Sequence, residues 1–187
     1  MQEEFVSESD AQKHSSRPVW VMVVLFLVVV TLLQWGWSEA RGTAVERTVI
    51  DKATVGTAVA IINNWTPQVQ AHASGSRIRA PGGGINVLNG CEGREVLFLF
   101  LAALMAYPLS WRTRIGGIVV GTAFVFVANQ VRLITLFYSY QSDRELFDQL
   151  HGLVMPLLLI VATLALFVAV LRLDERRNDR LPEADQA

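Results

Sequence analysis

Three residues of this chain, Cys91, Arg132 and His151, have side chains that together can perform acyl transfer. A histidine takes the proton of the thiol, and the resulting thiolate attacks a carbonyl carbon to form a thioester. A guanidinium stabilises the oxyanion of the tetrahedral intermediate. The histidine then protonates the leaving amine and deprotonates the incoming nucleophile. These three positions are therefore the candidate catalytic residues.

Each candidate also has a plainer interpretation. Cys91 is the only cysteine, which excludes an internal disulfide, a two-thiol redox pair and a zinc site built mainly on cysteine, but a lone thiol also packs as a small hydrophobe. Arg132 interrupts an apolar run, where a charge is functional by default unless it snorkels to the lipid headgroups. His151 is either catalytic or an interfacial histidine at a helix start, and His72 is a rival in a region where a surface role is favoured.

Three further residues are expected to support the candidates. Asn129 lies one helical turn before Arg132, so both project to the same side of a helix and can line one polar pocket. Gly93, like Gly90, leaves the backbone around the sulfur open to a substrate. Asp148 lies one turn before His151, where it either orients the imidazole or is a solvated acid. No metal or cofactor is expected.

The composition indicates a membrane protein. The chain has 187 residues, 52% of them hydrophobic, and a mean hydropathy of +0.36. The apolar residues are concentrated in blocks rather than spread at the intervals of a soluble core. The net charge of -1 says little by itself, and the absence of a basic stripe argues against nucleic acid as a partner.

These blocks predict an all-α polytopic membrane protein with about four transmembrane helices and a small extracytoplasmic α/β-like region between the first two. The first block follows a tail that is not strongly basic and precedes no A-x-A site, so an uncleaved span is favoured over a signal peptide. The predicted segments are tails at 1–18 and 174–187, spans at 19–37, 93–111, 115–138 and 152–173, and outer segments at 38–92 and 139–151.

The outer segment 38–92 is expected to fold in two halves. Residues 44–63 have moderate helical character, and the alternation that follows predicts a hairpin or three short strands. Pro81-Gly82-Gly83-Gly84 is interpreted as a flexible turn, with an anion cradle as the weaker alternative.

Arginines near the predicted span ends indicate the orientation. Arg112 and Arg114 lie between the second and third spans, and Arg172, Arg176, Arg177 and Arg180 follow the fourth. These ends and both termini are therefore expected in the cytoplasm, with segments 38–92 and 139–151 outside. At a rise of 1.5 Å per residue, the three catalytic candidates then reach one depth near the outer boundary.

At these residues the sequence resembles the exosortase/archaeosortase family of polytopic membrane enzymes. The resemblance covers residues 79–173 and consists of Cys91-Glu92-Gly93 before a span, Asn129-Gln130-Val131-Arg132 late in the next, and His151 opening the last. It implies a compact four-span member or the catalytic core. In that case Cys91, Arg132 and His151 are the catalytic residues of a cysteine protease/transpeptidase, and Asn129 supports the pocket.

The resemblance also implies the setting of the reaction. The substrates would be proteins with a C-terminal sorting signal, made of a short motif, a hydrophobic span and a basic tail. The enzyme would lie in a bacterial inner membrane with its site facing the periplasm, in contact with membrane lipids and with a lipid or glycan as a possible acyl acceptor. The alternative is a non-catalytic membrane subunit of a polysaccharide-export or protein-sorting complex, and a small transporter is a weaker third interpretation.

Overall fold

The computed structural model describes residues 17–87 and 93–184, most of which are helical. In chain order the elements are α1 (Val19–Ala40), α2 (Ala44–Glu46), η1 (Arg47–Gly56), α3 (Thr57–Trp65), η2 (Pro67–Val69), β1 (His72–Ser74), β2 (Arg77–Ala80), β3 (Gly83–Asn86), α4 (Arg94–Ala106), α5 (Trp111–Ser142), α6 (Arg144–Gln149), η3 (Leu150–Val154) and α7 (Met155–Ala184).

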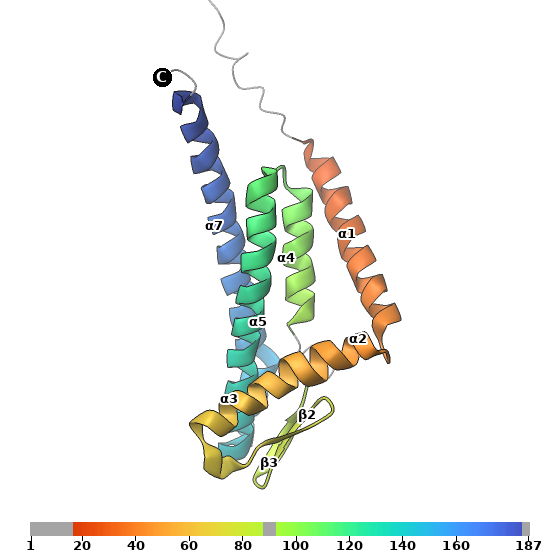
Figure 1. Ribbon diagram of the computed structural model, residues 1–187, viewed down its shortest axis with the longest axis vertical. Coiled ribbons are helices and arrows are strands. Elements are labelled where there is room, and N and C mark those ends of the chain that lie inside the picture. The colour runs from red at the N-terminus through yellow and green to blue at the C-terminus, as the bar shows by residue number, and fades with distance from the viewer. Residues whose placement is uncertain (1–16, 88–92, 185–187) are drawn as a thin grey trace, which may run out of the picture.

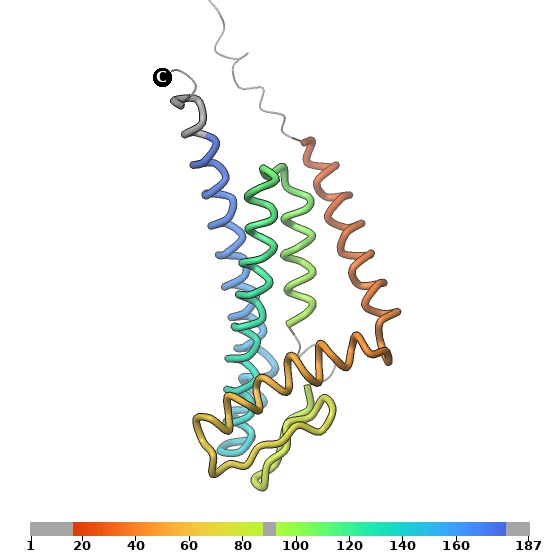
Figure 2. The backbone as a smooth tube through the Cα atoms, viewed as in Figure 1, coloured from red at the N-terminus to blue at the C-terminus, as the bar shows by residue number. Residues whose placement is uncertain are grey.

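The molecule has a bundle of helices and, at one end of the bundle, a small folded region made of residues 44–86, which we call the cap. Helices α1, α4, α5 and α7 run along the long axis, and the continuous helical stretch α2-η1-α3 crosses one end of the bundle (Figure 1). The backbone then folds back into the three strands at the same end (Figure 2). The cap therefore joins the bundle at the C-terminal end of α5.

Three helices of the described chain are long and apolar enough to cross a membrane: Val19–Ala40, Trp111–Ser142 and the continuous helix Arg144–Asn178. They correspond to the predicted first, third and fourth spans. The predicted second span, 93–111, is not confirmed, because α4 has only 13 residues. At about 20 Å it is shorter than a hydrocarbon core of about 30 Å.

Arginine side chains bind the last carbonyls of α4, which ends directly before Tyr107 and Pro108. Arg114 donates from Nε to the Leu104 carbonyl (3.3 Å) and from Nη2 to the Tyr107 carbonyl (3.2 Å). Arg17 donates to the Ala106 carbonyl at 3.4 Å. The last carbonyls of a helix lack partners within the helix, so two guanidinium groups stabilise this terminus. Hydropathy continues past Ala106, but the helix does not.

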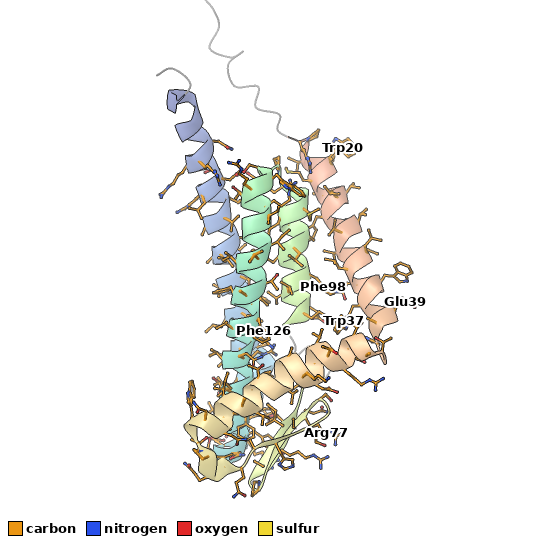
Figure 3. All side chains as sticks on the ribbon, viewed as in Figure 1. Trp20, Trp37, Glu39, Arg77, Phe98 and Phe126 are labelled. Carbon is orange, nitrogen blue, oxygen red and sulfur yellow. The ribbon has the colours of Figure 1, made fainter. Side chains whose placement is uncertain are left out.

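Glycines bring α4 and α5 together. A Cβ at Gly121 would lie 2.0 Å from Cε1 of Phe100, and one at Gly117 would lie 3.2 Å from Cδ1 of Leu104. Small residues one turn apart let membrane helices approach closely, because little separates the two backbones. Helix α1 lies at the edge of the bundle, packs mainly against α4 and has no buried residue. Trp20 and Trp37 lie near its opposite ends (Figure 3), as expected of residues at the two membrane interfaces.

The cap confirms the predicted helix and short strands of segment 38–92. Its antiparallel sheet has the order β1-β2-β3, with Ile78 paired to Ile85. These two residues are buried, while Arg77, Arg79 and Asn86 are exposed, so the sheet has one apolar face. That face joins a core with the crossing helix and the second half of α5; the core residues are Val55, Ala58, Ile62, Ala71, Ile78, Ile85, Val87, Leu133, Ile134, Leu136 and Phe137.

Candidate active site

The second half of α5 carries four buried polar residues in an apolar helix, three of them close together and the fourth at Ser139. Asn129, Gln130 and Arg132 expose only 2%, 4% and 6% of their surface. Burying such groups is costly unless they are hydrogen-bonded or serve a function. Gln130 donates from Nε2 to the Thr54 carbonyl of η1 at 3.4 Å, so it ties the crossing helix to α5.

Gly93 lies against Asn129. Gly93 has φ of 69°, and a Cβ placed on it would lie 3.1 Å from Cγ and Oδ1 of Asn129. Both the left-handed backbone and the close contact therefore require glycine here. The next residue, Arg94, lies over the Trp37 ring of α1 at 5.2 Å and is 3.7 Å from Glu95. The start of α4 is thus fixed between α1 and α5.

Arg132 lies between this contact and a small pocket. It is three residues after Asn129 and four before Leu136, so these residues share one face of α5. Leu133 and Leu136 line a pocket of about 160 Å³. The other walls are Gly84, Ile85 and Asn86 of β3, together with Tyr140, Phe147 and His151. The pocket therefore lies between α5, the sheet and the start of the last long helix.

His151 lies at this pocket in a short stretch of π-helix, η3, a wide turn that often occurs at functional sites. Its ring stacks on Phe147, with centroids 5.3 Å apart and planes 5° apart. Phe147 meets Tyr140 edge-to-face at 5.2 Å, and the Arg144 guanidinium lies 4.2 Å from the centre of the Tyr140 ring. This row of rings holds the imidazole plane against the pocket.

The comparison with known families agrees with these observations. Residues 12–168 match the family model described as transmembrane exosortase (Exosortase_EpsH). The chain belongs to the transmembrane exosortase family. It is therefore a multi-pass membrane protein of a transpeptidase/protease family. No curated protein and no solved structure matches the chain significantly.

The predicted site residues of this exosortase have different outcomes in the structure. Gly93 and Asn129 are in contact. His151, from η3, lines the pocket whose α5 wall at Leu136 is one helical turn after Arg132. Asp148 is exposed on α6. Cys91 lies outside the described residues. His72 is exposed on β1 and does not line the pocket.

Sequence reasoning missed the aromatic residues of the candidate site. Segment 139–151, expected as an outer connection, is helical over most of its length, as the end of α5, then α6 and the start of η3. Phe147 and His151 are four residues apart, a helical spacing that was available as a signal. Gly83 and Gly84, interpreted as a flexible turn, belong to β3, where a Cβ at Gly83 would lie 3.0 Å from the Tyr140 ring. Among the described residues no cluster of His, Cys, Asp and Glu is suited to a metal ion.

Proposed function

We propose that this exosortase is a cysteine peptidase/transpeptidase that processes proteins bearing a C-terminal sorting signal through a thioester on Cys91. The observation that carries the proposal is the position of Arg132. Arg132 is 6% exposed and lies on the face of α5 whose next turn, at Leu136, lines a pocket together with His151. A buried charge beside a histidine pocket suits stabilisation of a developing oxyanion.

The position of Gly93 supports Cys91 as the nucleophile. Gly93 is two residues after Cys91 in the sequence, and it contacts Asn129 of α5. Asn129 lies one turn from Arg132 on the same face of α5. The sequence position of Cys91, two residues before Gly93, is therefore what supports it as the proposed nucleophile.

The proposed reaction has two halves. His151 takes the proton from the Cys91 thiol, and the sulfur attacks the scissile carbonyl carbon, which places a negative charge on the carbonyl oxygen facing Arg132. The C–N bond breaks as His151 gives its proton to the leaving amine. An acceptor hydroxyl, from water, a lipid or a glycan, then loses its proton to His151 and attacks the thioester, which frees the Cys91 sulfur to recover a proton.

The first prediction concerns the nucleophile and the oxyanion. With Cys91→Ala, processing of a co-expressed substrate should fall below detection, because no thioester forms. With Arg132→Gln, processing should slow by about 100- to 1000-fold, the usual cost of losing one oxyanion donor. Immunoblots of the substrate over time measure both effects. Wild type should also yield a substrate adduct that hydroxylamine cleaves.

The two histidines offer a matched control. His151→Gln should abolish processing, whereas His72→Gln, on an exposed strand residue, should leave it unchanged. All variants should reach the membrane in wild-type amounts. Processing by the Cys91→Ala protein would reject the thioester mechanism. Failure of a membrane-impermeant thiol reagent to label Cys91 would favour the non-catalytic subunit instead.

A further inference from the structure

A groove lies between α5 and α7 at the end of the bundle opposite the cap. It has a volume of about 670 Å³. Its walls are apolar and include Val120, Leu166 and Leu173. Val120 and Leu173 are 55% and 61% exposed. The groove is thus at the other end of the bundle from Arg132 and His151. A molecule bound in it would not contact the candidate active site.

Glycine makes the groove open. A Cβ placed on Gly116 has no atom within 4 Å, whereas one on the next residue, Gly117, would touch Leu104 and Val170 at 3.2 and 3.3 Å. Gly116 therefore faces free space, and Gly117 packs into the bundle. A long apolar chain fits along such a surface between two membrane helices without displacing either of them.

Arginines form the mouth of the groove. Arg112 at the start of α5 and Arg176 and Arg177 near the end of α7 line it, and all three are exposed. The nearby Asp174 is buried; its carboxylate accepts hydrogen bonds from the Ser110 amide (3.3 Å) and hydroxyl and also interacts electrostatically with Arg177. The mouth is therefore positively charged, directly beyond an apolar groove.

The charge limits what can occupy the groove. A transmembrane helix ending at this depth commonly carries its own lysines and arginines, which these arginines would repel. A second copy of the groove would bring arginine against arginine. An acidic phospholipid instead offers a phosphate to the guanidinium groups and an acyl chain to the apolar walls.

We propose that the groove between α5 and α7 binds an acidic phospholipid, with its phosphate at Arg112, Arg176 and Arg177 and an acyl chain over Gly116. Such a lipid would fix the spacing of the two long helices at this end of the bundle. The proposal is independent of the reaction at the other end.

Native mass spectrometry of the protein in detergent measures which lipids it retains. This measurement tests whether the arginines at the mouth of the groove bind the lipid phosphate. Dioleoylphosphatidylglycerol should bind at least 10-fold more tightly than dioleoylphosphatidylcholine. The double variant Arg176→Gln/Arg177→Gln should weaken phosphatidylglycerol binding by about 30-fold, from the usual contribution of two surface arginines. Glycerol phosphate, which has the phosphate but no acyl chain, should show no binding at the same concentration.

A matched pair of glycine variants tests the groove. Gly116→Leu should fill it and abolish selective retention of phosphatidylglycerol. Gly36→Leu on α1, another open helical position, should leave retention unchanged. Equal retention of the two lipids, wild-type binding by the arginine variant, or binding of glycerol phosphate alone would overturn the proposal. The proposal would also be overturned if the protein were a dimer that the Gly116→Leu substitution dissociates, because the groove would then be the interface between two copies.

Discussion

At the scale of single residues, the candidate site depends on how two side chains are held. Arg132 is buried within α5, so its position follows from the packing of that helix. His151 instead lies at the edge of the pocket, where its ring stacks on Phe147. In the proposed role of general acid and base, His151 must keep its ring nitrogens aimed at the reacting atoms, so loss of the stacked Phe147 ring should misorient it.

Phe147→Leu should therefore slow processing by up to about 10-fold, the rate equivalent of one aromatic contact. Phe147→Tyr keeps the ring and should restore the rate, which distinguishes positioning from a general loss of folding. Substrate processing at several pH values measures the effect. Leu146→Ala, at an exposed neighbouring position, is the control. A Phe147→Leu protein with the wild-type rate would show that the stack has no positioning role.

At the scale of elements, α5 organises the molecule. Its 32 residues extend about 48 Å, beyond the thickness of a hydrocarbon core. Its first half packs on α4 through Gly117 and Gly121, and its second half joins the core of the cap. Asn129 and Arg132 lie where the two halves meet, so the packing of the first half sets their depth.

The close packing of α5 against α4 at Gly121 can be tested by mutation. Gly121→Ala should destabilise the protein by about 1–3 kcal/mol, because its Cβ overlaps the Phe100 ring. Gly116→Ala, five residues earlier on the same helix and facing open space, should have little effect. Thermal unfolding in detergent measures the difference, and Phe100→Leu should partly restore the Gly121→Ala protein. Equal stability of the two alanine variants would contradict this packing.

At the scale of the whole molecule, the cap and the pocket lie at one end of the bundle, and a group of arginines next to the long helices lies at the other. Arg112, Arg114, Arg176 and Arg177 lie at the end without the cap, and the sheet and the pocket lie at the other. From the positive-inside rule we predict that the arginine end lies in the cytoplasm. The cap and the pocket would then face the periplasm, on the side of a sorting signal that has crossed the membrane.

Two introduced cysteines test this orientation in a Cys91→Ser background. Ser74→Cys, on the exposed strand β1, should react with a membrane-impermeant maleimide in spheroplasts. Glu175→Cys, exposed near the end of α7, should react only after the membrane is permeabilised. The opposite pattern would reverse the proposed orientation and put the pocket in the cytoplasm.

The sequence by itself determined the features that depend on composition and local period. Hydropathy and length identified α1, α5 and the helix containing α7, because a span needs a long apolar run. Alternation identified the strands of the cap. The rise per residue put Arg132 and His151 near one depth, because depth along a helix is fixed by chain position.

Only the tertiary structure decided which sides of the helices meet. The pocket combines β3, α5 and η3, and its walls at Asn86 and Leu136 are 50 residues apart in the chain. The C-terminal end of α4 also receives a hydrogen bond from Arg17, which is 89 residues from the Ala106 carbonyl that it binds. Hydropathy carries no information about such long-range contacts, because they follow from side-chain packing and hydrogen bonding between distant segments.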